Sequence, residues 1–392
     1  MGEIHEAASG SGWRGTVMVI AFDGRPMQGN ARGMGVYARG LLAGFVEAGL
    51  ADSVSVVLDR AMPRPELPAA YAVRVRMAGG PGGAVAWEQW HLPRAAAGCD
   101  VLHCTANAGP LISPVPVVLT LHDVIFLRKW REISDRTYAR QLAGHLYRTQ
   151  AYPPGARRAA ALVTVSEASR AGISASLRVP AERITVIHEA PGPAFASAAT
   201  APEAGIREKY GIQGPYLAAM GGYERRKNVA VLIRMLGNRM PGLPPTLVLA
   251  GAENIGATRY REEAERLKAG TTVRFLPYLD PGDLKGLLAA SAAFLWPSLR
   301  EGFGLPILEA MLAGAPVVAS DISVNREVAG AAAAYADPLD PRSWACVVAE
   351  ICGNARTADE LRKMGAERAA SFSWRRAAEE TMKIYCSVAG SR

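Results

Sequence analysis

Strand-like and helix-like segments alternate along almost the whole of this 392-residue chain, and this alternation limits the fold more than any other feature. Short apolar runs such as residues 16–21 and 115–121 have the length and the β-branched content of buried strands. Longer segments with apolar residues at helical spacing, such as 84–97, lie between them. Strands that alternate with helices form parallel sheets covered on both faces. The pattern therefore predicts an α/β protein.

A run rich in Pro, Gly, Ala, Ser and Thr interrupts the alternation between Pro191 and Pro202, and the same pattern resumes after it. The chain is long enough for two domains of ordinary size. We therefore predict a first domain at 1–192, a linker at 193–203 and a second domain at 204–372. The last segment, 373–392, has the apolar spacing of a helix.

Charge and cysteine content narrow the class of protein. The 44 Lys and Arg against 36 Asp and Glu give a formal charge of +8, which suits anionic ligands or an anionic membrane surface but is too dispersed to indicate nucleic acid binding. No apolar run is as long as a membrane span, and residues 1–12 do not resemble a signal peptide. Five scattered cysteines without metal spacing indicate mostly buried, reduced thiols in a cytoplasmic protein.

The strongest functional signal lies between Glu301 and Glu309, which bracket a short glycine turn after the strand-like segment 292–296. Pro306 suits the first helical position, and Glu309 then falls in the first helical turn. One glutamate there would be explained as a helix cap, but two around a glycine turn favour a ligand site. Backbone N–H groups at such a helix start bind anions or sugar oxygens. In this chain they come from Gly302, Phe303, Gly304 and Leu305.

Glu301-x7-Glu309, followed by Ala310-Met311-x-Ala313-Gly314-x-Pro316-Val317-Val318, resembles the signature of glycosyltransferase family 4. The resemblance implies a retaining, nucleotide-sugar-dependent enzyme with the GT-B fold. In that fold two Rossmann-like domains with parallel sheets face an interdomain cleft, and a C-terminal helix crosses back to the first domain. It also implies that Glu309 receives the ribose hydroxyls of the nucleotide and that Glu301 lies near the donor sugar.

A second motif, Arg225-Arg226-Lys227-Asn228, follows the strand-like segment 216–220 and a Gly-Gly turn. Three basic residues are often just a solvated turn, but the helix start at Val229 favours a phosphate site. The motif resembles the Arg-Lys-Asn loop of the family, which implies that Arg226 and Lys227 bind the donor diphosphate. Many members carry a further arginine where this chain has Gly221 and Gly222, so one phosphate-binding cation is either missing or supplied by Arg225.

In the first domain, His122 follows the strand-like segment 115–121. Its position alone favours a structural role. Leu121-His122-Asp123 resembles the cleft histidine of the family, which implies contact with the donor sugar and leaves Asp123 to orient the loop. Gly33 and Gly35 open a helix after the loop 22–32, and they lack the third glycine of a dinucleotide fingerprint. They resemble the N-terminal glycine loop of the family, which lies across the cleft from the donor.

We predict catalytic roles for His122, Glu301, Arg226 and Lys227. The chain has no Asp-x-Asp motif for a metal, and Arg226 with Lys227 would hold the diphosphate instead, so we predict that neither a metal nor a cofactor is required. The family resemblance implies front-face transfer with retention. It favours a hexose, with GDP-mannose ahead of a UDP-sugar, moved to a lipid-linked glycan in bacterial polysaccharide or lipopolysaccharide synthesis.

Residues 127–158 carry many arginines interleaved with Trp130, Tyr138, Tyr147 and Tyr152, in a predicted helix closed by Pro153-Pro154-Gly155. This segment is either a solvated helix face or a surface that meets anionic lipids at the inner face of the cell membrane.

Two other functions stay open. A non-catalytic nucleotide-sugar-binding protein of the same fold is disfavoured by the presence of Glu301, Glu309, Lys227 and His122. A nucleotide-sugar epimerase of similar fold is disfavoured by the Glu301-x7-Glu309 spacing.

Overall fold

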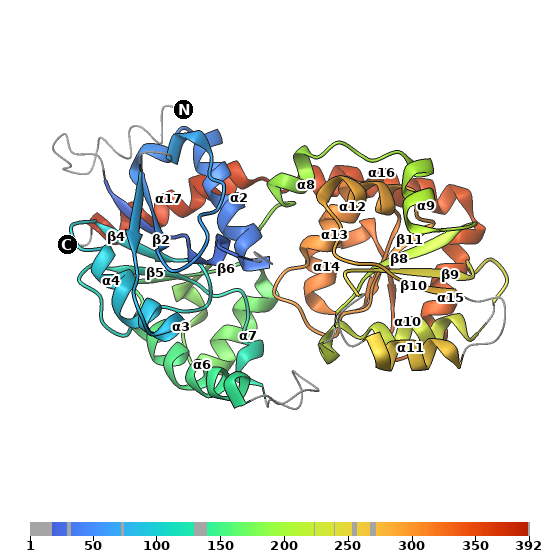
Figure 1. Ribbon diagram of the computed structural model, residues 1–392, viewed down its shortest axis with the longest axis horizontal. Helices are drawn as coiled ribbons and strands as arrows, with labels where there is room; N and C mark the ends of the chain where they lie inside the picture. Colours follow the sequence, from blue (N-terminus) through green and yellow to red (C-terminus); the bar gives the residue numbers. More distant parts are fainter. Residues whose placement is uncertain are drawn as a thin grey trace. The chain divides into compact units, whose positions relative to one another are not determined.

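A computed structural model describes residues 18–29, 33–71, 74–128, 139–222, 224–238, 240–252, 257–266 and 272–390. They form two compact units (Figure 1). Unit 1 contains the chain up to Leu127, Arg140–Glu189 and the chain from Ser373 on, and unit 2 contains Ala190–Phe372. Among these residues, no helix is both long enough and apolar enough to cross a membrane.

Unit 1 is built on a seven-stranded sheet in the order β3-β2-β1-β4-β5-β6-β7, and every neighbouring pair is parallel. The strands are β1 (Ile20–Asp23), β2 (Val54–Asp59), β3 (Val75–Ala78), β4 (Val101–Cys104), β5 (Val117–Thr120), β6 (Ala161–Thr164) and β7 (Ile184–Val186). All residues of the central strands β1, β4 and β5 are buried, as expected for a parallel sheet covered on both faces. The predicted α/β architecture is confirmed for this unit.

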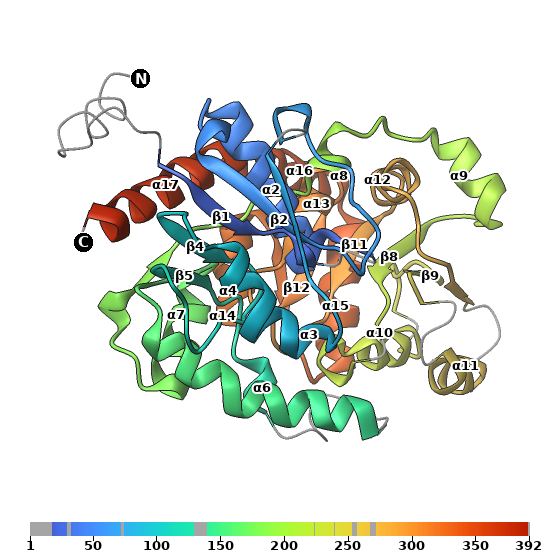
Figure 2. The same ribbon diagram turned by 60° about the vertical axis from the view of Figure 1, so that its left-hand side comes forward.

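Helices cover both faces of this sheet (Figures 1 and 2). The main ones are α2 (Gly33–Glu47), α3 (Gly83–Ala86), α4 (Leu92–Ala95), α6 (Ala139–Arg158), α7 (Glu167–Leu177) and α17 (Trp374–Gly390). A π-helical turn, η4 (Trp87–His91), joins α3 to α4. Short 3₁₀ turns occur at η1 (Arg25–Met27), η2 (Ala51–Ser53), η3 (Ala69–Tyr71), η5 (Ile125–Leu127) and η6 (Ala181–Arg183).

Helix α6 corrects one prediction, because it continues through Pro153 and Pro154 to Arg158 instead of ending there. Each interior proline removes a backbone hydrogen bond and costs roughly 3 kcal/mol. Packing on both sides of the prolines compensates for this cost. Ala151 and Tyr152 pack with Phe126 before the prolines, and Ala156 lies in the main core after them. Tertiary contacts therefore override the local break signal.

The C-terminal helix α17 packs along α2 within unit 1 (Figure 2). Glycines on α2 make this close approach possible. A Cβ atom on Gly40 would lie 2.1 Å from the indole of Trp374, and one on Gly44 would lie 2.0 Å from the Trp374 carbonyl oxygen. The prediction that the last helix returns to the first domain is confirmed.

Unit 2 repeats the architecture with a six-stranded parallel sheet in the order β10-β9-β8-β11-β12-β13. The strands are β8 (Tyr216–Met220), β9 (Thr246–Ala250), β10 (Thr272–Phe275), β11 (Ala293–Trp296), β12 (Val317–Ser320) and β13 (Ala334–Ala336). The helices are α8 (Pro193–Ser197), α9 (Glu203–Tyr210), η7 (Arg225–Lys227), α10 (Val229–Leu236), α11 (Ala257–Glu265), α12 (Pro281–Ala289), α13 (Leu305–Leu312), α14 (Ser323–Ala329), η8 (Gly330–Ala332), α15 (Pro341–Gly353) and α16 (Ala355–Ala370).

The predicted linker and thiols differ in detail from expectation. Residues 193–203 include helix α8, which packs against α12 and α13, so this segment is part of unit 2.

Cys99 and Cys104 are buried, whereas Cys346 and Cys386 are exposed. The prediction of mostly buried thiols is therefore wrong, because two of the cysteines lie on the outer faces of helices α15 and α17.

Candidate functional site

The basic motif and the glycine turn of unit 2 lie side by side. The basic motif follows β8 and the turn follows β11, and these strands are neighbours in the sheet, so both loops leave its carboxyl edge together. Arg226 Nη1 lies 2.8 Å from one carboxylate oxygen of Glu301, and Lys227 Nζ lies 2.8 Å from the other. The structure thus joins three of the four predicted catalytic side chains in one cluster.

Backbone contacts fix the two loops in this position. Leu299 N–H donates to the Arg226 carbonyl oxygen at 2.7 Å. Asn228 adopts a left-handed conformation with φ of 52°, which asparagine tolerates, and its side-chain amide donates to the carbonyls of Pro297 and Pro338. Asn228 therefore ties the basic loop to the loops that follow β11 and β13.

The cluster is electrostatically balanced although it is largely buried. The Glu301 side chain is only 10% exposed. Burial opposes its ionisation, but the charges of Lys227 and Arg226 outweigh that effect and hold the pKa of Glu301 below its ordinary value. Lys227 Nζ also lies 4.4 Å from the ring centroid of Trp296, and Arg226 pairs with Glu224 at 2.5 Å. These cations are thus presented in a fixed arrangement.

The absence of an arginine before the basic motif has a steric explanation. A Cβ atom on Gly222 would lie 2.9 Å from Cγ of Lys227, so a side chain there would collide with the stem that carries the lysine charge. A Cβ atom on Gly221 would lie 2.4 Å from Cβ of Ala252 and 2.9 Å from its Cα. Neither position therefore has room for a side chain larger than that of glycine. Arg225, the predicted substitute, is exposed.

Helix α13 begins one residue earlier than predicted, at Leu305. Pro306 is therefore its second residue, and Glu309 lies past the first turn, so the dipole argument made for Glu309 is wrong; its side chain is half-buried. Gly304, with φ of 124°, precedes the helix in a conformation that L-residues rarely adopt. Phe303 is buried edge-on to Phe372, with ring centroids 5.8 Å apart, which anchors the turn.

Unit 1 holds the remaining predicted residues, Gly33, Gly35 and His122. Gly33 is exposed and Gly35 is buried in the first turn of α2. His122 is buried at the carboxyl end of β5, where Nδ1 lies 3.2 Å from Glu189 and Nε2 lies 2.9 Å from the Thr105 carbonyl oxygen. As predicted, Asp123 binds the loop backbone, accepting from Ile125 N–H.

The surroundings of His122 favour its charged form. Burial opposes protonation, but the hydrogen bond and charge of Glu189 outweigh it and raise the pKa of His122. Because a carbonyl and a carboxylate both accept, an imidazolium that donates from both nitrogens satisfies this arrangement. Tyr37 stands edge-on to the ring, with centroids 4.7 Å apart. The ring of His122 is therefore held in place by partners at both nitrogens and by Tyr37.

A second buried acid lies at the carboxyl end of β1. Asp23 is 5% exposed, and its Oδ1 accepts from Trp87 Nε1 at 3.2 Å and from Arg25 N–H at 3.1 Å. Burial raises the pKa of Asp23 to about 7. The nearby Glu88 on the π-helical turn accepts from Tyr147 at 2.8 Å, and its pKa is raised by burial as well.

Sequence reasoning missed Glu189, Tyr37, Trp296 and Thr105 as partners of the predicted residues. Glu189 had a usable signal, because it closely follows β7 and so lies at the same sheet edge as His122. The contacts of Tyr37 and Trp296 depend on packing that no local pattern encodes. Within the described ranges, no group of three or more His, Cys, Asp or Glu residues is placed to hold a metal ion.

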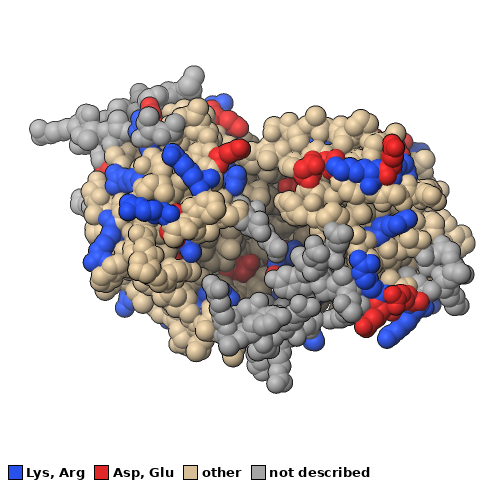
Figure 3. All heavy atoms as spheres, in the orientation of Figure 1, with Lys and Arg blue, Asp and Glu red and all other residues tan. Residues whose placement is uncertain are grey.

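The segment 127–158 is only partly described. Trp130 and Tyr138 lie outside the described residues. Tyr152 is buried, and Tyr147 turns toward Glu88, so these two aromatic residues do not face outward as a lipid-binding surface would require. On the face shown in Figure 3, the described basic side chains are spread among acidic ones and do not gather in one patch.

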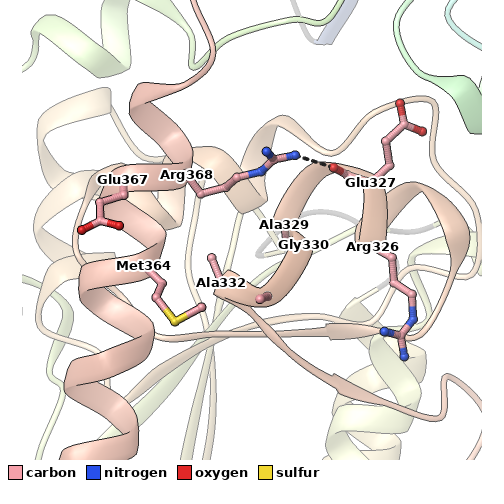
Figure 4. A pocket seen from close by; sticks show the side chains of 9 residues that line it. Arg326, Glu327, Ala329, Gly330, Ala332, Met364, Glu367 and Arg368 are labelled. Carbon is pink, nitrogen blue, oxygen red and sulfur yellow. Dashed lines mark hydrogen bonds between the residues drawn. The ribbon is translucent and has the colours of Figure 1, made fainter.

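A separate groove of about 400 Å³ lies on unit 2 between α14 and α16 (Figure 4). Arg368 points across it and donates to the carbonyls of Glu327 and Val328 at 2.6 and 2.8 Å, which caps the end of α14. Met364 contributes an apolar wall. None of the predicted site residues lines this groove.

Two family models match the chain. The model described as Glycosyltransferase Family 4 matches residues 31–190, and the model described as Glycosyl transferases group 1 matches residues 204–369. The O-antigen chain mannosyltransferase B of Escherichia coli is 31% identical over 228 residues, which are 57% of this chain and 60% of that protein. The serotype-specific mannosyltransferase WbdA of Escherichia coli is 27% identical over 67% of this chain. The chain spans only 32% of WbdA.

Solved structures show the same fold at low identity. Anabaena HepE in complex with UDP-glucose has a TM-score of 0.67 at 18% identity, covering 94% of this chain and all of that chain. WaaG, a glycosyltransferase involved in lipopolysaccharide biosynthesis, has a TM-score of 0.67 at 18% identity, covering 94% of this chain and 99% of that one. Both neighbours support two Rossmann-like units of the GT-B type.

Proposed function

The chain belongs to glycosyltransferase family 4, and from that premise we propose that it transfers a hexose from a nucleotide diphosphate sugar to a glycan acceptor. The observation that carries the proposal is the cluster in which Glu301 holds Arg226 and Lys227 at the carboxyl edge of the unit 2 sheet. In open α/β sheets ligands bind at this edge.

The cluster suits a diphosphate leaving group. Arg226 offers a planar fork and Lys227 a point charge, so together they stabilise the negative charge that grows on the departing phosphate. Glu301 and Glu224 together balance the charges of Arg226 and Lys227. We infer that the diphosphate takes over this role when it binds, and that Glu301 then accepts from hydroxyls of the donor sugar. Glu309 binds the ribose hydroxyls.

Transfer proceeds with retention at the anomeric carbon by a front-face route. The bond from the anomeric carbon to the β-phosphate oxygen breaks, and the acceptor oxygen bonds to the same face. The acceptor proton passes to the leaving phosphate. His122 contacts the donor sugar, and the two cations of unit 2 take the place of a metal ion. Treatment with EDTA followed by dialysis therefore leaves the rate unchanged, whereas a fall that Mg²⁺ or Mn²⁺ restores would contradict metal independence.

Mannose from GDP-mannose is the proposed donor, because relatives from Escherichia coli are named mannosyltransferases. A UDP-sugar is the alternative, because HepE was solved with UDP-glucose. A thermal-shift screen against GDP, UDP, ADP and TDP and their sugars separates the two. We expect the Tm to rise most with GDP-mannose.

Lys227→Ala tests whether this response comes from the cluster. It abolishes the rise in Tm, whereas the matched change Lys363→Ala, at an exposed position on α16, preserves it. Nucleotide binding that survives Lys227→Ala would refute the proposed site. Binding by the wild-type protein without transfer or donor hydrolysis would favour a non-catalytic nucleotide-sugar-binding protein.

We also propose that the acceptor is lipid-linked and that unit 1 touches an anionic membrane surface through α6. Leu142 and Leu146, four residues apart on this helix, are 46% and 60% exposed. Exposed apolar side chains beside arginines bind anionic interfaces. Replacing both leucines with aspartate abolishes co-sedimentation with phosphatidylglycerol vesicles but leaves donor binding intact. Unchanged co-sedimentation of the variant would refute this contact.

A further inference from the structure

A continuous line of buried polar side chains crosses unit 1 from α17 to His122. The Tyr385 hydroxyl lies 2.5 Å from Nδ1 of His103, and Nε2 of His103 lies 2.8 Å from Oγ1 of Thr120. The same Oγ1 lies 3.0 Å from the hydroxyl of Tyr37. The Tyr37 ring then meets the ring of His122 edge-on. All five side chains are buried.

Filling the space between a helix and a sheet with these polar side chains costs more free energy than filling it with apolar ones. Buried hydroxyl and imidazole groups cost free energy unless each finds a partner, and apolar side chains would pack there without that cost. Here each polar group is satisfied by the next one in the line. Networks that are fully satisfied fix the positions of their members. The hydrogen-bonded line therefore fixes the positions of its side chains more than it stabilises the fold.

His103, at the centre of the line, determines which groups donate and which accept along it. Burial lowers the pKa of His103 to about 3, so its ring is neutral. A neutral imidazole donates from one nitrogen and accepts at the other. When the Tyr385 hydroxyl donates to Nδ1, the proton of the neutral ring lies on Nε2, and Nε2 then donates to Thr120 Oγ1. Without that hydroxyl, either nitrogen of His103 can carry the proton. The hydrogen bonds of Thr120 to His103 and to Tyr37 are then no longer fixed.

We propose that Tyr385 is a positioning residue for His122, acting through His103, Thr120 and Tyr37. Thr120 holds the hydroxyl end of Tyr37, and Trp374 at the start of α17 contacts the same Tyr37 ring with centroids 5.9 Å apart. The C-terminal helix thereby supports the histidine of unit 1. The catalytic consequence rests on the proposed function, but the placement of His122 does not.

Several groups set the charge of His122. Glu189 faces Nδ1 and the adjacent Asp123 adds a second negative charge, and both raise its pKa. The carbonyl oxygen of Thr105 faces Nε2 and acts in the same direction. On the side of the ring that faces α2, the aromatic ring of Tyr37 packs edge-on against His122. A change in the position of Tyr37 therefore changes the surroundings in which His122 titrates.

The test follows the imidazole signal of His122 by NMR as the pH is changed. Tyr385→Phe and Thr120→Val should shift the pH at the midpoint or split the signal, whereas Thr120→Ser keeps the hydroxyl and restores the wild-type curve. Tyr71→Phe is the matched control, since Tyr71 is equally buried and donates instead to the Leu42 carbonyl oxygen of α2. A wild-type curve for Tyr385→Phe, or the same shift in Tyr71→Phe, would overturn the proposal.

Activity provides a second readout. Tyr385→Phe should lower kcat about five- to tenfold and shift the alkaline limb of its pH profile, with the KM for the donor unchanged. A rise in donor KM with an unmoved pH profile would contradict a role through His122. A wild-type protein without transferase activity would refute the proposed function instead, and the NMR titration would still decide the placement of His122.

Discussion

Replacing Asp23 with asparagine should stabilise unit 1, and the gain should grow as the pH rises. Burial raises the pKa of Asp23 from 3.8 to about 7, so the folded state holds the proton more tightly than the unfolded chain does. Stability therefore falls as the pH rises from about 4 to about 7, and the full cost remains above that range. An asparagine oxygen still accepts from Trp87 and Arg25 but carries no charge.

The magnitude follows from the size of the shift. One pKa unit corresponds to about 1.4 kcal/mol, so the raised pKa of Asp23 costs at most about 4 kcal/mol at pH 8 and roughly 1.5 kcal/mol at pH 5, relative to low pH. The advantage of the asparagine variant should therefore increase by about 2–3 kcal/mol between these two pH values. For a unit of this size, that increase corresponds to about 5–10 °C in Tm.

Differential scanning calorimetry at pH 5 and pH 8 measures this directly. Asp52→Asn is the matched control, because the Asp52 side chain is 82% exposed and its replacement should change stability by less than about 0.5 kcal/mol at either pH. We expect the Tm difference between Asp23→Asn and the wild type to grow from pH 5 to pH 8. If it stays constant or shrinks, burial does not raise the pKa of Asp23 as described.

Three further changes test packing and charge. Gly40→Ala should lower the Tm of unit 1 by the equivalent of about 2–3 kcal/mol because its methyl group meets Trp374, whereas Gly205→Ala, on exposed α9 with open space around it, should not. Gly222→Ala should weaken nucleotide binding about tenfold in calorimetry by displacing Lys227; unchanged affinity would count against the site. Glu301→Gln should destabilise unit 2 by about 3 kcal/mol at pH 7. That loss should shrink as the pH falls from 4.5, the ordinary pKa of a glutamate, through the lowered pKa of Glu301, and a loss that stays constant over this range would contradict the ion pairs.

The fold was largely predictable because its signals are local. The apolar run 216–220 is a strand with those same bounds, since buried parallel strands need continuous apolar residues. The error at Pro153 and Pro154 arose because a break signal is local whereas the contacts that hold α6 together come from Phe126 and the main core.

The loops that carry the site residues were predictable, but the contacts among their side chains were not. The sequence indicated which loops carry Arg226, Lys227 and Glu301, because each loop follows a strand. It did not show that the carboxylate binds both cations, since the two segments are 74 residues apart along the chain. Nor did it show that His122 is held by Glu189, because that pairing depends on side-chain directions at the sheet edge.

The most direct test of the central claim is a time course of the one-dimensional proton NMR spectrum of GDP-mannose with the protein. We expect that the anomeric signal of GDP-mannose decays and that the first new sugar signal has the α configuration, in a glycoside or in slowly released mannose. We also expect that Lys227→Ala abolishes the decay while Lys363→Ala does not. A first product of β configuration, or decay that survives Lys227→Ala, would contradict retention at this site.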